Sequence, residues 1–176
     1  MKKQKGFSLI ELLIVVAIIL IIAAIAIPNL LRSKMAANES SAVGSIRTIN
    51  TAEVTYSSSW GTGYSVDLAS LGGPAPCAAA TAAAACLIDP LLSVAPNTKS
   101  GYVFNAAGTL LVNGVYNGFE VNATPSVVQQ TGVRAFCSDQ TGVIRFVSPG
   151  TAAIGVAAGT CAAVTTVPGT SGPVGN

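Results

Sequence analysis

Few residues of this chain could carry out chemistry, and they are scattered. The 176 residues include no histidine, and the seven carboxylates stand far apart in the sequence. They are Glu11, Glu39, Glu53, Asp67, Asp89, Glu120 and Asp139. General acid–base catalysis and metal cages need several such groups in one place, and the sequence has no P-loop, G-x-S-x-G or dinucleotide-binding motif. We therefore expect a protein that is not an enzyme and that binds no metal or cofactor.

The charge balance argues against a nucleic-acid partner. Charged residues make up 9% of the chain, and the formal net charge is +2. Three of the nine basic residues are Lys2, Lys3 and Lys5, so the chain after Gly6 is nearly neutral. A phosphate-binding surface needs clustered lysine and arginine side chains.

Glu11 is the one ionisable residue in an apolar run of 21 residues, 7–27. As a helix this run would be about 32 Å long, which is enough to cross a bilayer. The lysine-rich leader would stay in the cytoplasm, so the rest of the chain would lie outside. A carboxylate in the membrane costs about 2.5–3.5 kcal/mol even on lenient scales, and it is expected to have a partner.

Two ordinary explanations of the apolar run stay open. A secretory signal has a basic start, an apolar centre of about 7–15 residues and a small-residue cleavage site, for which Ala24-Ile25-Ala26 is suited. A plain signal anchor is the other explanation. The anchor gives no reason for an acidic side chain near the start of the run.

Residues 5–13, Lys-Gly-Phe-Ser-Leu-Ile-Glu-Leu-Leu, resemble the processing site of type IV prepilins and of the related pseudopilins of type II secretion, the class III signal. Gly6, Phe7, Glu11 and Pro28 all stand where the family pattern places them, and the resemblance extends to about residue 60. It implies that a prepilin peptidase cuts after Gly6 and methylates the new terminal amine of Phe7.

The resemblance also implies a structural function. The chain would be a type IV pilin precursor, held in the inner membrane and then assembled by the pilus machinery, with identical or related subunits, into an extracellular filament for adhesion or motility. A pseudopilin of a type II secretion system is the alternative with the same architecture. A secreted soluble adhesive or binding domain is the alternative from another class. Major pseudopilins commonly carry an acidic calcium loop, and the lone carboxylate of Asp139 is too few for one, which favours a pilin.

Glu11 would then act in subunit assembly. After cleavage its carboxylate lies one turn from the chain end and could pair with the Phe7 amine of a neighbouring subunit. Inside an apolar bundle an unpaired charge is expensive, whereas a paired charge fixes the register. The family uses its matching glutamate for assembly. The alternative is that Glu11 only compensates its own amine and helix dipole.

The chain is expected to comprise a leader (1–6), a transmembrane and assembly helix (7–28), an amphipathic helix (29–60) and a β-rich domain (61–176). Pro28 lacks a backbone donor and should kink the helix without ending it. Beyond it, apolar residues at steps of three, four or seven predict a stripe that packs on the C-terminal domain. The stripe consists of Leu31, Met35, Ala42, Ile46, Ile49, Ala52, Tyr56 and Trp60. The polar remainder of the helix includes Glu39 and Glu53.

The C-terminal domain is predicted to be an antiparallel meander, with hairpin turns at Asn117-Gly118 and at 139–142. The predicted strands are Tyr102–Ala106, Leu110–Tyr116, Phe119–Ala123, Val133–Ser138 and Val143–Val147. Ile144 and Phe146 should face the helix, which gives an α+β fold of the type IV pilin kind. The alanine-rich segment 77–86 is a candidate short helix, and the residues from about Pro168 onward are expected to fray.

Four cysteines in an exported chain indicate two disulfides, with three possible pairings. We expect Cys77–Cys86, which closes a short loop, and Cys137–Cys161, which ties the C-terminal segment to a strand. The second pair is similar to the disulfide-bounded C-terminal loop of many type IV pilins. Zinc is less suited, because the chain has no C-x-x-C pair and no histidine.

Overall fold

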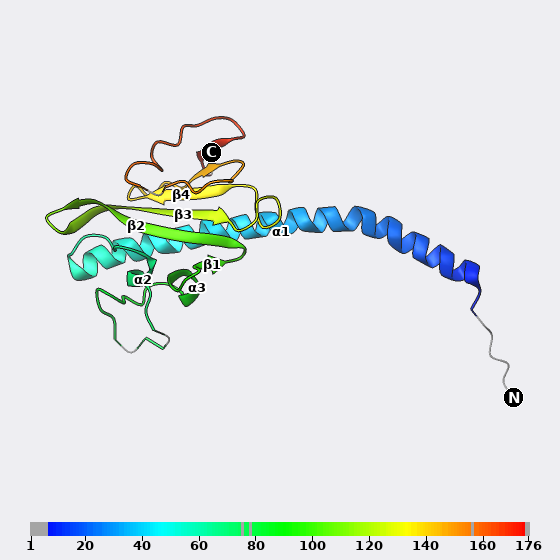
Figure 1. Cartoon of the computed structure of the whole chain (residues 1–176), viewed down its shortest axis with the longest axis horizontal. Helices are drawn as coiled ribbons and strands as arrows, with labels where there is room; N and C mark the ends of the chain where they lie inside the picture. The colour runs from blue at the N-terminus through cyan, green and yellow to red at the C-terminus, as the bar shows by residue number, and fades with distance from the viewer. Residues whose placement is uncertain (1–6, 75, 78, 156, 175–176) are drawn as a thin grey trace. The chain divides into compact units, whose positions relative to one another are not determined.

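The computed structural model describes residues 7–74, 76–77, 79–155 and 157–174, and Figure 1 shows its elements. The chain divides into two compact units, Met1–Lys34 and Met35–Asn176. The long helix α1, Leu9–Trp60, begins in the first unit and ends in the second. Two short helices, α2 at Leu68–Leu71 and α3 at Pro90–Ser93, belong to the second unit.

From Leu12 to Ile27, within the first unit, α1 is apolar on every side. Its large hydrophobic side chains are all exposed, from 43% for Val16 to 79% for Phe7 just before the helix. Among the described residues, α1 is the one helix that is long and apolar enough to cross a membrane, with a mean hydropathy of 3.3 over 18 residues. A helix that is hydrophobic all round is not stable in water. This part of α1 therefore needs lipid or other apolar helices around it.

The second unit combines the C-terminal part of α1 with a six-stranded antiparallel sheet, so the predicted α+β fold is confirmed (Figure 1). The strands are β1 Thr98–Lys99, β2 Tyr102–Val112, β3 Val115–Pro125, β4 Ala135–Asp139, β5 Arg145–Val147 and β6 Ser171–Pro173. Each strand pairs with the next one in the sequence. The sheet is therefore the meander that the strand spacing predicts.

The hydrophobic core lies between α1 and the sheet. Ile46 and Ile49 have no exposed surface and belong to one cluster with Phe104, Phe119 and Phe136 from three neighbouring strands. Ile144 lies in the same cluster and Phe146 packs against it, as predicted. The stripe is buried from Ala42 to Tyr56, whereas Leu31, in the first unit, is exposed.

The predicted turn at Asn117-Gly118 is wrong. The chain runs straight through Gly118, which pairs with Thr109 inside the β2–β3 ladder. The turn lies at Asn113-Gly114, where both residues have positive φ, 50° and 80°, as a type I′ hairpin requires. Consequently the turn divides the predicted strand Leu110–Tyr116. Its first residues extend β2, which runs from Tyr102 to Val112, and its last two, Val115 and Tyr116, begin β3.

Register explains why the earlier Asn-Gly pair forms the turn. With the turn at 113–114, Ala106 pairs with Val121 and Phe104 pairs with Ala123. These four side chains are all buried in the core cluster. Since side chains alternate along a strand, only a register that puts both apolar sets on one face can bury them together.

Two further expectations are wrong. The alanine-rich segment has no helix in its described residues, 77 and 79–86: the Cα atoms of Cys77 and Cys86 lie 6.2 Å apart, whereas a helix of that length would separate them by about 14 Å. The tail does not fray from Pro168, because β6 pairs with β5 and the Val174 N–H donates to the Ile144 carbonyl at 2.8 Å. Backbone pairing needs no particular side chain, so the small uncharged residues there can still form a strand.

Candidate assembly site

The proposed processing site lies at the start of the chain. Gly6 is outside the described residues. Phe7 and Ser8 precede the first turn of α1, and the Phe7 side chain is 79% exposed. The structure therefore leaves cleavage after Gly6 and methylation of Phe7 as predictions.

Glu11 caps the start of α1. It is the third residue of the helix, and its Oε2 accepts a hydrogen bond from the Ser8 backbone N–H at 2.9 Å. This is the carboxylate half of a capping box, in which an acid in the first turn satisfies a backbone donor that has no helical partner. The negative charge also suits the positive end of the helix dipole. The side chain is exposed, so its second oxygen is free to meet a group from outside the chain.

Pro28 lies inside α1, and the helix continues past it to Trp60. The expectation that Pro28 does not end the helix therefore holds. The kink at this residue stays a prediction.

Glu39 ties α1 to the sheet. Its Oε1 accepts the backbone N–H groups of Val133 and Arg134 at 2.8 and 3.2 Å, and its Oε2 lies 2.7 Å from Arg134 Nη2. The Arg134 guanidinium also lies over the rings of Phe136 and Phe146, at 5.4 and 5.2 Å. One carboxylate thus holds the chain just before β4 against the helix.

Glu53 makes a second tie and is completely buried. Its two oxygens accept the Ser65 backbone N–H at 2.9 Å and the Ser65 hydroxyl at 2.7 Å. Burial raises the pKa of Glu53 to about 7, although the two bonds from Ser65 act in the opposite direction. The side chain anchors the segment that follows α1 to the last turns of the helix.

The expectation that Glu39 and Glu53 belong to the polar face of the helix is wrong, because both side chains are buried. Both stand at steps of three or four from buried residues, Glu39 before Ala42 and Glu53 between Ile49 and Tyr56. The stripe therefore passes through them. The helical period could have predicted their burial from the sequence, but the partners that satisfy their carboxylates come from loops that the sequence does not place.

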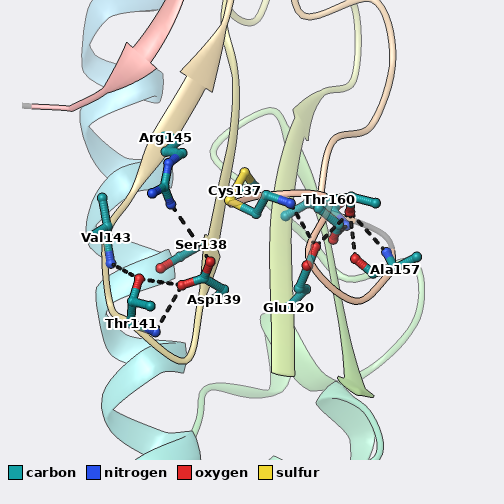
Figure 2. Close-up of a disulfide and its surroundings, with 12 residues drawn as sticks. Glu120, Cys137, Ser138, Asp139, Thr141, Val143, Arg145, Ala157 and Thr160 are labelled. Carbon is teal, nitrogen blue, oxygen red and sulfur yellow. Dashed lines mark hydrogen bonds and ion pairs between the residues drawn. A yellow bond between two sulfur atoms is a disulfide. The ribbon is translucent and has the colours of Figure 1, made fainter. Parts of the chain in front are cut away.

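Two more buried acids, Glu120 on β3 and Asp139 on β4, lie near the Cys137–Cys161 disulfide (Figure 2). Glu120 Oε2 accepts the Thr160 hydroxyl at 2.8 Å and the Cys161 N–H at 3.1 Å. Asp139 accepts from the Thr141 N–H at 2.9 Å, and its Oδ2 lies 3.7 Å from Arg145 Nη1. These acids hold the C-terminal segment and the β4–β5 turn in place.

The two disulfides join the pairs expected from the sequence, Cys77–Cys86 and Cys137–Cys161. Cys77 is exposed, whereas Cys137 and Cys161 are fully buried. The described part of the chain contains no group of three or more His, Cys, Asp or Glu residues that could hold a metal ion. The polar groups with defined partners thus serve to fasten segments together.

Comparison with known proteins bears on the N-terminal segment. Residues 1–27 match the family model described as the prokaryotic N-terminal methylation motif. The N-terminal segment of this chain is therefore a class III signal. The match confirms the resemblance that Gly6, Phe7 and Glu11 indicate, and it covers the class III signal alone.

Two curated relatives are pilus proteins. The chain is 62% identical over 39 residues to the type IV wide pilus major component PilA4 of Thermus thermophilus, covering 22% of this chain and 30% of the relative. It is 45% identical over 54 residues to the type IV major pilin protein PilA of Myxococcus xanthus, covering 31% of this chain and 24% of the relative. The chain thus spans about a quarter to a third of the length of the relatives it matches. No solved structure matches the chain significantly.

The class III signal and the exposed apolar part of α1 agree on location. Together with the pilin relatives, they support the inner membrane as the first location and an extracellular pilus as the second.

Proposed function

We propose that this chain is the precursor of a type IV pilin, a structural subunit that polymerises into an extracellular filament for adhesion or motility. The observation that carries the proposal is the class III signal on residues 1–27, together with the part of α1 in the first unit, whose large apolar side chains are all exposed. An anchor needs only the apolar run. A subunit that leaves the membrane also needs partners that cover the apolar surface of this helix. Copies of the same helix can provide that cover.

The second unit is suited to the outside of such a filament. Two disulfides and four buried acids fasten its loops. The disulfides fit an oxidising environment outside the cytoplasm. We propose no enzymatic role, because the buried acids are occupied in holding segments together. The relatives named as pilus components favour a pilus over a secretion pseudopilus and over a soluble secreted domain.

The proposed partners follow from this function. They are a prepilin peptidase that cuts between Gly6 and Phe7, the pilus assembly machinery, and identical or related subunits. Glu11 would pair with the methylated Phe7 amine of a neighbouring subunit. In the described chain its Oε2 accepts one backbone N–H, so the carboxylate has capacity for a second donor.

The test is the intact mass and N-terminal sequence of material sheared from the cell surface and kept non-reducing. We expect a chain that starts at N-methylated Phe7 and lacks four hydrogens because of its two disulfides. A Gly6→Leu variant is the matched control, and it should accumulate as the uncut precursor. A chain that starts at Ile27, cut after Ala24-Ile25-Ala26, would show an ordinary secreted protein and overturn the proposal.

A further inference from the structure

A groove of about 380 Å³ opens on the second unit, lined by residues of the C-terminal end of α1 and of the tip of the β2–β3 hairpin. Three tyrosines line it, Tyr56, Tyr64 and Tyr116, together with Thr62. We call it the tyrosine groove. Its volume is within the range of about 300–1,000 Å³ that is usual for small-molecule sites. Nothing in the proposed assembly function uses it.

Direct contacts hold the walls of the tyrosine groove together. The Tyr56 hydroxyl donates to the Ala82 carbonyl at 2.7 Å, which joins the alanine-rich loop to the helix. The Tyr64 N–H donates to the Tyr116 carbonyl at 2.9 Å, which joins the segment after α1 to the hairpin. The Tyr64 ring lies 5.0 Å from the Phe119 ring. The groove is therefore formed before any ligand arrives.

The Tyr116 ring is positioned by a glycine. A Cβ built on Gly108 would lie 2.7 Å from Tyr116 Cγ, so the ring packs directly over the glycine backbone. Any larger residue at position 108 would displace the ring. Tyr116 thus offers an aromatic surface whose place is fixed by the strand next to it.

The tyrosine groove offers hydroxyl groups without hydrogen-bond partners and has an uncharged lining. Neither the Tyr64 nor the Tyr116 hydroxyl has a hydrogen-bond partner among the described residues, and both rings are half-buried. The lining residues carry no charge. A charged ligand would lose its water without gaining a partner charge there, which is unfavourable.

We propose that the tyrosine groove binds a neutral saccharide. The C–H faces of a hexose ring pack on aromatic rings, and its hydroxyls bond to neutral donors and acceptors such as phenols. An acyl chain would leave both free phenols unsatisfied. A peptide strand would need open backbone groups, but the Tyr116 carbonyl already accepts the Tyr64 N–H. The inference goes beyond the proposed function and requires only that the second unit lies outside the cell.

The test uses the full chain in micelles of a sugar-free detergent, applied to an array of neutral and sialylated oligosaccharides. We expect retention on neutral oligosaccharides, and about a tenfold or greater loss of affinity for Tyr116→Ala. Leu91→Ala is the matched control, since Leu91 is 57% exposed on α3, outside the groove. It should bind like the parent chain.

Conservative variants keep the result interpretable if Tyr116→Ala does not fold. Tyr116→Phe keeps the ring and loses the free hydroxyl, so it should weaken binding without abolishing it. Absence of retention on every neutral oligosaccharide, retention on sialylated ones alone, or equal binding by Tyr116→Phe and the parent chain would overturn the proposal. Because the assay uses micelles, a failure to form filaments would not affect it.

Discussion

Glu39 and Arg134 stand 95 residues apart in the sequence and are joined by two hydrogen bonds and an ion pair. The Arg134 backbone N–H and Nε–H donate to the two carboxylate oxygens at 3.2 and 2.8 Å, and Nη2 lies 2.7 Å from Oε2. This contact fixes where the entry to β4 meets α1.

Replacing Glu39 should destabilise the second unit. Glu39→Ala leaves the N–H groups of Val133 and Arg134 without their acceptor and removes the partner of a half-buried guanidinium. We expect a loss of about 2–3 kcal/mol in the free energy of unfolding, measured by urea with Trp60 fluorescence. Arg47→Ala, at an exposed position of the same helix, is the control and should change stability by less than about 0.5 kcal/mol. Equal effects of the two variants would refute the role of Glu39.

Glu53 should make stability depend on pH near neutrality. Its pKa is about 7 in the folded chain, against an ordinary value of 4.5. Between these values the folded state keeps a proton that the unfolded state has lost, so stability falls as the pH rises from about 4.5 to about 7 and is constant above. The full difference is about 3 kcal/mol.

Glu53→Gln removes this dependence, because the amide cannot ionise. We expect the variant to match the parent chain near pH 5 and to be more stable than it near pH 8. Asp89→Asn is the control: the Leu91 N–H lowers the pKa of Asp89, so its contribution has the opposite sign and its loss should not flatten the decline. If Glu53→Gln and the parent chain differ by the same amount at every pH, Glu53 does not titrate in this range.

The two disulfides should differ in their response to a reductant. Cys77 is exposed, while both cysteines of Cys137–Cys161 are buried, and exchange requires a thiolate to reach a sulfur. Mild reductant without denaturant, followed by alkylation and mass mapping, should label Cys77 and Cys86 first. Simultaneous labelling of all four cysteines in folded protein would contradict this order.

Two exposed glycines should respond in opposite directions to alanine. At Gly44 and at Gly114 a new Cβ would have no atom within 4 Å, so packing is not involved. Gly44 lies in α1, where alanine is favoured by about 1 kcal/mol. Gly114 has a φ of 80° in the hairpin turn, where alanine should cost about 1–2 kcal/mol. Thermal unfolding of both variants gives the comparison, and a shift of the same sign in both would be inconsistent with it.

Glu11 variants separate helix capping from subunit pairing. Glu11→Ala loses both the bond from the Ser8 N–H and the charge, whereas Glu11→Gln keeps an oxygen for Ser8 and loses only the charge. If pairing with the Phe7 amine drives assembly, both variants should stay in the membrane and form few filaments, as counted in sheared fractions by electron microscopy. Normal filament numbers from Glu11→Gln would show that capping alone is needed.

The sequence alone determined the main features of the N-terminal third of this protein, up to the end of α1. The apolar run with Glu11 near its start, Gly6 before Phe7, and the stripe from Ala42 to Tyr56 all depend on local order or on the helical period. Each of these features depends only on residues that lie within a few turns of one helix. They can therefore be predicted without knowing what lies across from them.

Only the tertiary structure decided the rest. Asn113-Gly114 and Asn117-Gly118 are equivalent as local turn signals, and the choice between them came from burying both apolar sets of the hairpin on one face. Likewise, only the folded chain brings Ser65 back to the helix, where it satisfies the buried Glu53 carboxylate. The tyrosine groove joins Tyr56, Ala82 and Tyr116 from separate segments. These features depend on contacts between distant residues, whose free energy is gained only when the whole second unit is folded.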